Sequence, residues 1–304
     1  MKRIAFLFSG QGAQYPGMGK ELFEDSPAAR AVFDLADEIR PGTSEQCFFG
    51  TKEELVLTAN TQPCLFCMDL AAACALAEKG IAPAACAGFS LGEIAALSFT
   101  GVLSYEDGFR LVCKRAALMQ EAAEKAKGAM AAVLKLSDAA IEALCDSFPG
   151  VYPVNYNCPG QVAVAGRAEA MPAFCAAVKE AGGKAVMLAV SGAFHSPLMD
   201  EAAAGLGAAL EGFQPSAPRI PLYANRTGEL YGENIRELIA TQVNHPVRWT
   251  HTVQNMAKAG AEVFVECGAG KTLAGLVSKI LPDAVVCRVE NAETLKQAVK
   301  ICGG

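Results

Sequence analysis

The chain alternates between short apolar runs and longer helical patterns. The short runs, which fit buried β-strands, cover residues 4–8, 81–89 and 263–266. The longer segments, which fit α-helices, cover residues 60–77, 93–103 and 104–125. Strands that alternate with helices in this way indicate an α/β fold. Residues 64–77 are apolar on nearly every side, so we expect a central buried helix there, ended by Gly80.

The pattern changes between residues 127 and 190. Here the expected strands cover residues 130–136, 151–155, 161–165 and 184–190, and the expected helices cover 137–148 and 168–181. This β-α-β-β-α-β order is typical of a ferredoxin-like unit. Because the larger pattern resumes afterwards, we predict a discontinuous large domain, 1–126 and 191–304, with a small inserted domain, 127–190.

Composition excludes several classes of protein. The 304 residues carry a net charge of −6 and a sequence pI near 5.3, so the chain has no basic field for nucleic acid. No apolar stretch approaches the ~20 residues that cross a membrane. The first apolar run ends at Phe8, which is too short for an export signal. The twelve cysteines are scattered within apolar runs, so we expect buried thiols, no zinc site and a cytoplasmic protein.

Ser90 lies in a G-x-S-x-G sequence formed by residues 88–92, between an expected strand and an expected helix. In this setting a serine occupies a sharp turn that exposes its hydroxyl as a nucleophile. Glycines two residues on either side permit the close crossing of strand and helix. The alternative is a glycine-rich turn with an ordinary capping serine.

Two further residues stand out by their position. Arg115 lies in the middle of the apolar face of the helix 104–125, where an unpaired charge costs several kcal/mol. Its partner is either a carboxylate of the protein or one that arrives with the substrate, and the helix alone does not decide between them. His195, one of three histidines, lies in a Gly/Ser/Pro-bounded loop before a helix, and we favour a catalytic role over a structural one.

Taken together, several separated strings resemble the malonyl-CoA:acyl-carrier-protein transacylases over essentially the whole chain. The strings are residues 10–14, 88–93, Arg115, 193–195, Gln242 with 246–249, and 266–271. The resemblance implies a hydrolase-like parallel α/β core that carries a ferredoxin-like insertion. One residue departs from the family, because Phe89 stands where a histidine commonly precedes the nucleophile. A phenylalanine ring supplies neither the polar contact nor the pH dependence attributed to that histidine.

The resemblance also implies roles for individual residues. Ser90 resembles the nucleophile and His195 the base. Backbone N–H groups of Gln11 and Leu91 match the oxyanion hole, and Arg115 matches the residue that binds the malonyl carboxylate. Gln242 matches a residue whose backbone carbonyl orients the histidine. Phe194, directly before the base, is expected beside the acyl carbon, where a phenylalanine goes with malonyl and a small residue with methylmalonyl.

The predicted reaction is a two-step transfer through a serine ester. Malonyl-CoA is the expected donor, and the phosphopantetheine thiol of an acyl carrier protein is the expected acceptor. We expect no bound cofactor, no metal and a monomer. The alternatives are a serine thioesterase or esterase with water as acceptor, and a carrier-binding module without chemistry.

Overall fold

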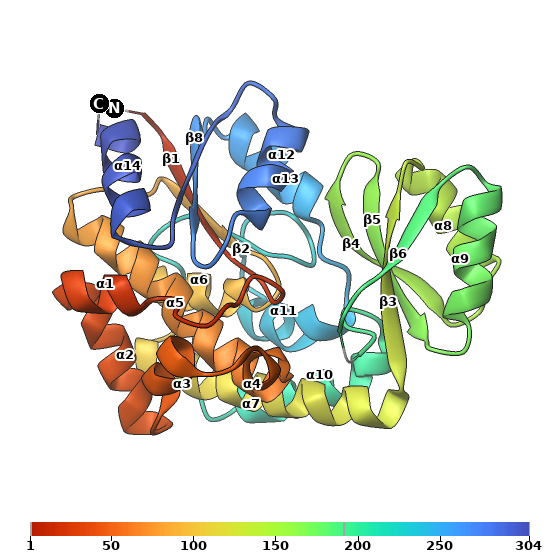
Figure 1. The fold of residues 1–304 in the computed structure, drawn as a ribbon, viewed down its shortest axis with the longest axis horizontal. Coiled ribbons are helices and arrows are strands. Elements are labelled where there is room, and N and C mark those ends of the chain that lie inside the picture. Colours follow the sequence, from red (N-terminus) through yellow and green to blue (C-terminus); the bar gives the residue numbers. More distant parts are fainter. Residues whose placement is uncertain (1, 191, 304) are drawn as a thin grey trace.

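The structure is a computed structural model that describes residues 2–190 and 192–303. Its larger part is built on a parallel five-stranded sheet with the order β7-β2-β1-β8-β9 (Figure 1). The strands are β1 (Ile4–Phe8), β2 (Ala85–Gly88), β7 (Leu222–Tyr223), β8 (Val263–Cys267) and β9 (Val285–Val289). Every residue of β1 and β8 is buried, as expected for central parallel strands covered on both faces.

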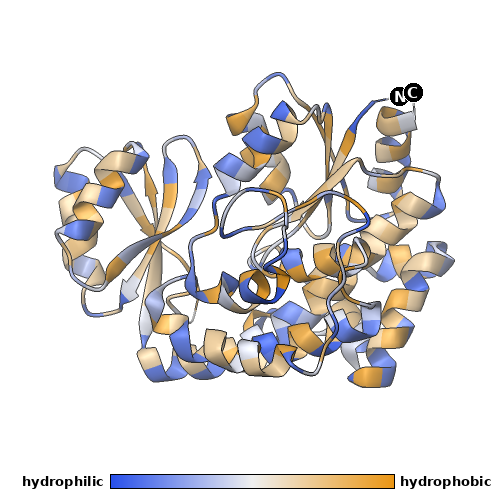
Figure 2. Ribbon diagram, turned by 180° about the vertical axis from the view of Figure 1, so that it is seen from behind, coloured by the Kyte–Doolittle hydropathy of each residue, from blue (hydrophilic) through white to orange (hydrophobic). Residues whose placement is uncertain are grey.

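Helices cover both faces of this sheet. Those before the insertion are α1 (Lys20–Asp25), α2 (Pro27–Ile39), α3 (Thr43–Phe49), α4 (Lys52–Val56), α5 (Thr58–Glu78), α6 (Gly92–Phe99) and α7 (Tyr105–Ala126). Those after it are η1 (Pro197–Met199), α10 (Asp200–Leu210), α11 (Ile235–Thr241), η2 (Gln242–Asn244), α12 (Trp249–Lys258), α13 (Thr272–Ile280) and α14 (Ala292–Gly303). Hydrophilic and hydrophobic residues alternate along the outer helices, as amphipathic helices with one buried face require (Figure 2).

The central helix α5 is buried along nearly its whole length, which confirms the expected core helix. Its start differs from the prediction, because it begins at Thr58 instead of residue 60, and Pro63 lies inside the helix. The carbonyl of Leu57 accepts hydrogen bonds from the N–H groups of Asn60 and Thr61, and these bonds form the first turn earlier than the apolar pattern indicated.

The insertion forms a separate antiparallel sheet with the order β4-β5-β3-β6. Its elements are β3 (Gly128–Leu134), α8 (Asp138–Asp146), β4 (Val151–Cys158), β5 (Gln161–Arg167), α9 (Met171–Glu180) and β6 (Lys184–Met187). This order confirms the ferredoxin-like prediction, although β6 ends three residues earlier than expected. The domain boundaries at 127 and 190 remain a prediction.

The small sheet is joined to the larger part through the segment before α12. The N–H of Tyr156 donates to the carbonyl of Val247 at 2.9 Å, and the N–H of Val247 donates to the carbonyl of Val154 at 2.8 Å. These bonds bring β4 beside the carboxyl ends of the parallel strands, where ligands bind in open α/β sheets. In residues 2–190 and 192–303, no helix is both long and apolar enough to cross a membrane.

Candidate active site

Ser90 occupies the turn between β2 and α6 with a φ of 54°, in the left-handed region that non-glycine residues rarely adopt. The flanking glycines make this turn possible. A Cβ added to Gly88 would lie 2.0 Å from the carbonyl carbon of Gly92, and one added to Gly92 would lie 2.3 Å from the carbonyl oxygen of Phe8. The strand and helix therefore cross too closely for any side chain at either position.

His195 lies against the serine, 105 residues away along the chain. Ser90 Oγ is 2.7 Å from His195 Nε2. On the other side of the ring, His195 Nδ1 is 3.0 Å from the carbonyl oxygen of Gln242 and 3.2 Å from that of His245. Because both carbonyls can only accept, Nδ1 carries the hydrogen and Nε2 is free to accept the serine proton.

The environment of His195 keeps its ring neutral. Burial, assisted by the positive charge of Arg115, lowers the pKa of His195 to about 4, although hydrogen bonds to the carbonyls of Gln242 and His245 act in the opposite direction. A neutral imidazole is the form that accepts a proton. The ring is therefore poised as a base at neutral pH.

Arg115 is 1% exposed, and its guanidinium reaches the serine. One terminal nitrogen donates to Gln62 Oε1 at 2.7 Å; the other donates to Gln242 Oε1 at 2.7 Å and to Ser90 Oγ at 3.2 Å. Its Nε is buried and has no hydrogen-bond partner among the described residues. Burial lowers the pKa of Arg115 to about 10, partly offset by the charge of Glu93.

The internal salt bridge considered for Arg115 does not occur among the described residues. The salt bridges found there all involve other side chains. The guanidinium is instead held by neutral amide oxygens. A buried guanidinium without a carboxylate partner can bind the carboxylate of a substrate.

Two backbone N–H groups beside the nucleophile are free. Leu91 caps the N-terminus of α6, and Gln11 lies in the loop after β1. Neither N–H has an acceptor among residues 2–190 and 192–303. A Cβ on Gly10 would lie 2.8 Å from the carbonyl oxygen of Phe89, so this loop packs directly against the serine turn. The arrangement suits an oxyanion hole that waits for a substrate oxygen.

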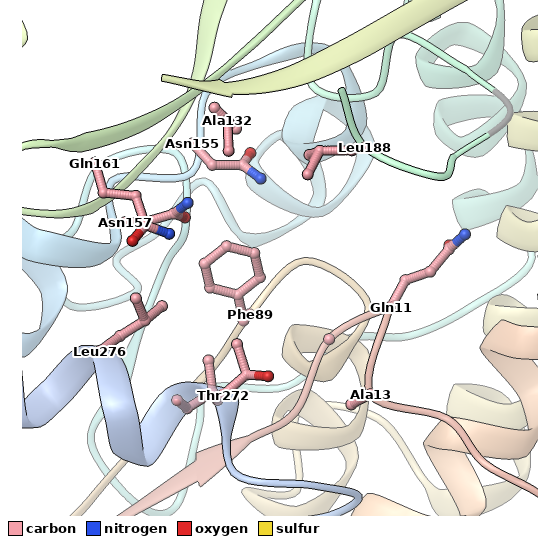
Figure 3. Close-up of a pocket in the computed structure, with 13 residues that line it drawn as sticks. Gln11, Ala13, Phe89, Ala132, Asn155, Asn157, Gln161, Leu188, Thr272 and Leu276 are labelled. Carbon is pink, nitrogen blue, oxygen red and sulfur yellow. The ribbon is translucent and has the colours of Figure 1, made fainter. Parts of the chain in front are cut away.

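The reacting groups line a cavity of about 100 Å³ that continues into a second one of about 210 Å³. The two cavities share Gln11, Phe89, Asn155 and Leu188. Figure 3 shows the second cavity between α13 and the small sheet, with Phe89 projecting into it and Gln11 at one side. The cavity that holds the serine therefore lies at the junction of the two parts of the molecule.

The family follows from comparison with known proteins. Residues 5–296 match the acyl transferase domain family. The malonyl CoA-acyl carrier protein transacylase of Bacillus subtilis is 39% identical over 99% of this chain and 97% of its own length. The chain belongs to the malonyl CoA-acyl carrier protein transacylase family. The Escherichia coli K12 transacylase is 36% identical over 99% of this chain and all of its own length.

Solved transacylase structures agree with this assignment. The transacylase of Clostridium perfringens superposes with a TM-score of 0.95 at 35% identity, covering 98% of this chain and 96% of that one. A transacylase in complex with a type II polyketide acyl-carrier protein has a TM-score of 0.95 and 35% identity, with 99% and 100% coverage. These transacylases support the transferase prediction and lend no support to the thioesterase or esterase alternative.

Phe89, the departure from the common transacylase sequence, is an apolar wall of both cavities. Its ring packs edge-on against Trp249, with the centroids 5.3 Å apart. Phe194 is 6% exposed and lines the smaller cavity together with Ser90, Met119 and Met130. Phe194 therefore lies in the same cavity as Ser90, and its role in selecting the acyl group stays a prediction.

Three site residues were missed by sequence analysis. Asn225 Oδ1 accepts from the N–H of Ser90 at 2.7 Å, and its amide donates to the carbonyl of Gly88, so it braces the serine turn. Gln62 binds Arg115, and Glu93 is a buried carboxylate on α6. A charged residue directly before the apolar run 94–97 was a usable signal for Glu93. No local signal marked Asn225, which follows β7.

Proposed function

We propose that this chain transfers a malonyl group from malonyl-CoA to the phosphopantetheine thiol of an acyl carrier protein. The observation that carries the proposal is the buried guanidinium of Arg115, which lies 3.2 Å from Ser90 Oγ and has no carboxylate partner among the described residues. An acyl group on Ser90 that ends in a carboxylate would meet this cation, whereas a neutral acyl group would leave it unpaired.

Acylation begins with proton transfer from Ser90 Oγ to His195 Nε2 across 2.7 Å. The serine oxygen attacks the thioester carbon, and the carbonyl oxygen becomes an oxyanion. The N–H groups of Gln11 and Leu91 bind this oxyanion, and one such donor typically contributes a factor of ~10²–10³ in rate. The thiol of CoA leaves with the proton from His195, and malonyl remains as an ester on Ser90.

Deacylation repeats these steps with a different nucleophile. His195 takes the proton of the pantetheine thiol, the sulfur attacks the ester, and Ser90 Oγ leaves with that proton. Gln242 supports both steps, because its backbone carbonyl holds Nδ1 of the ring. The nucleophile, base and oxyanion donors all come from this chain, so we propose that no bound cofactor or metal takes part. A cytoplasmic monomer is part of the same proposal.

Replacing Arg115 with alanine tests the proposal. The variant should lose malonyl transfer about tenfold to a hundredfold, because a charged hydrogen bond of ~1.5–3 kcal/mol is removed from the acyl carboxylate. Acetyl transfer should change much less, so the two acyl-CoAs become comparable. The measurement is kcat/KM for acyl-enzyme formation with each, and Arg110→Ala, on the exposed face of α7, is the matched control. Equal loss with both substrates would contradict carboxylate binding.

Replacing Phe194 with serine should change which acyl group is accepted. With the carboxylate held by Arg115, an α-methyl group must occupy the space of the Phe194 ring, and overpacking of this kind costs ~1–3 kcal/mol. Phe194→Ser should therefore raise methylmalonyl transfer relative to malonyl by about tenfold to a hundredfold. Competition between the two acyl-CoAs measures the ratio. An equal fall for both would make Phe194 a packing support for His195.

A further inference from the structure

Glu93 is a buried carboxylate that the reaction scheme leaves unused. It lies on α6, three residues after the nucleophile, and is 1% exposed. Its Oε1 accepts from the N–H of Asn225 at 2.9 Å and from the hydroxyl of Tyr231 at 2.8 Å. Its Oε2 accepts from Nε2 of Gln242. A buried carboxylate needs all of these hydrogen-bond donors. One of the donors is the side chain of Gln242, whose backbone carbonyl also accepts from His195.

Gln242 contacts Ser90, His195 and Arg115 at once. Its side-chain Nε2 donates to the carbonyl of Ser90 at 2.7 Å as well as to Glu93, and its Oε1 accepts from Arg115 at 2.7 Å. Its backbone carbonyl accepts from His195. Both hydrogens of the Gln242 amide are therefore used on one side, and its only side-chain acceptor faces the guanidinium.

The orientation of this amide decides whether the Arg115 nitrogen that faces Ser90 has Gln242 Oε1 as an acceptor, because Gln62 Oε1 binds the other terminal nitrogen. Turned by 180°, the amide would direct Nε2 at the guanidinium, so two donors would meet, and its oxygen would face the Ser90 carbonyl. Burial raises the pKa of Glu93 to about 7, and in its ionised form this carboxylate can only accept. The ionised form therefore selects the orientation in which Nε2 faces it and Oε1 faces Arg115. Because the site is buried, the orientation that places two donors together has a high free energy.

We propose that Glu93 is a positioning residue for acyl selection: through the amide of Gln242 it fixes the guanidinium of Arg115 beside the nucleophile. The inference rests on the proposed function, in which Arg115 binds the carboxylate of the acyl group. Glu93 contacts no reacting atom. Glu93 acts on Arg115 through the amide of Gln242. Replacing Glu93 should therefore change the preference for malonyl over acetyl more than the rate of the reaction at Ser90.

Glu93→Gln is the sharpest variant, because it keeps the shape and replaces one acceptor by a donor. The NH₂ group of the new amide would face a second donor in either orientation. That donor is Gln242 Nε2 in one orientation and the N–H of Asn225 in the other. The backbone N–H of Asn225 cannot turn away, so the new amide keeps its oxygen toward Asn225 and presents its nitrogen to Gln242. The Gln242 amide is then driven to turn, and the Arg115 nitrogen beside Ser90 loses Gln242 Oε1 as its acceptor. We expect kcat/KM for malonyl-CoA to fall by about tenfold or more, with a much smaller fall for acetyl-CoA.

The matched control is Tyr231→Phe, which removes a donor to Glu93 Oε1 and leaves Gln242 untouched. It should retain the malonyl-to-acetyl ratio of the unaltered enzyme. An equal loss for both substrates in Glu93→Gln, or no loss at all, would overturn the proposal. Should Glu93→Gln fail to fold, Gln242→Ala replaces it, since it keeps the backbone carbonyl for His195 and removes the amide. An unchanged acyl preference in Gln242→Ala would equally overturn the proposal.

Arg115→Ala separates failure of this inference from failure of the proposed function. If Arg115→Ala removes malonyl preference and Glu93→Gln does not, only the positioning role of Glu93 is wrong. If Arg115→Ala itself leaves the preference intact, carboxylate binding by Arg115 is wrong, and the inference falls with it.

Discussion

Replacing Ser90 with alanine should abolish the malonyl-enzyme and lower kcat/KM for malonyl transfer by about 10⁴-fold or more. The expected loss is large because, in the proposed reaction, the serine oxygen carries the acyl group between the two half-reactions. Among the described residues that line the smaller cavity, no other side chain carries a hydroxyl or thiol that could replace it. The fold should survive, because alanine is smaller and the turn is held by Gly88, Gly92 and Asn225.

The intact mass of the protein after incubation with malonyl-CoA measures this directly. Ser147→Ala is the matched control, because Ser147 is an exposed serine at the end of α8 in the small part of the molecule. The control should carry the malonyl mass, and Ser90→Ala should not. A malonyl adduct that persists in Ser90→Ala would remove this serine from its role.

Much of the fold could be predicted from local pattern. The uninterrupted apolar residues of β1 and β8 and the all-round apolar α5 were recognisable because central elements are buried on every side. The six elements of the small sheet were recognisable because their order admits few topologies. The true start of α5 at Thr58 was missed, because the carbonyl of Leu57 that begins it carries no periodic signal.

The candidate site could be predicted only in part. Ser90 was marked by its glycines, His195 by its loop and Arg115 by its place on an apolar face. The roles proposed for Gln11, Leu91 and Gln242 depend on backbone atoms, so no side-chain pattern could reveal them, and the family resemblance supplied them.

What the sequence could not provide is the set of contacts between distant segments. Asn225 braces the serine turn from 135 residues away, and Gln62 binds Arg115 across 53 residues. Such contacts exist only once the sheet has brought the carboxyl ends of its strands together. The same holds for the side chain of Gln242, whose amide joins Glu93 to Arg115.

Replacing His195 with alanine should slow acylation and deacylation together, each by about 10²–10⁴-fold. In the proposed reaction one ring is the base in both half-reactions, because its Nε2 lies 2.7 Å from Ser90 Oγ. The hydroxyl of Ser90 would retain its contact with Arg115, but a guanidinium only donates, so it cannot take the proton.

The pH dependence of the unaltered enzyme follows from the same ring. Burial and the charge of Arg115 both disfavour the imidazolium, and they lower the pKa of His195 to about 4. The proposed base is the neutral ring, so protonation of His195 should slow acylation as the pH approaches 4. Arg115→Ala removes a positive charge that opposes protonation. The pKa of His195 should rise in that variant, and its acid limb should move to higher pH.

Rapid-quench measurement of acyl-enzyme formation and decay, repeated across pH, tests these expectations together. His251→Ala is the matched control, because His251 lies on α12 and pairs with Glu229 at 2.9 Å, away from the cavity that holds Ser90. The control should keep both rates and the acid limb of the pH profile.

If His195→Ala slowed only one half-reaction, a second base would have to act in the other. Among the described residues that line the smaller cavity, Ser90 and His195 are accompanied by Gln11, Asn155 and apolar side chains, none of which could take a thiol or hydroxyl proton. Loss of both half-reactions in His195→Ala, together with an acid limb that Arg115→Ala moves upward, would therefore assign both proton transfers to this one ring.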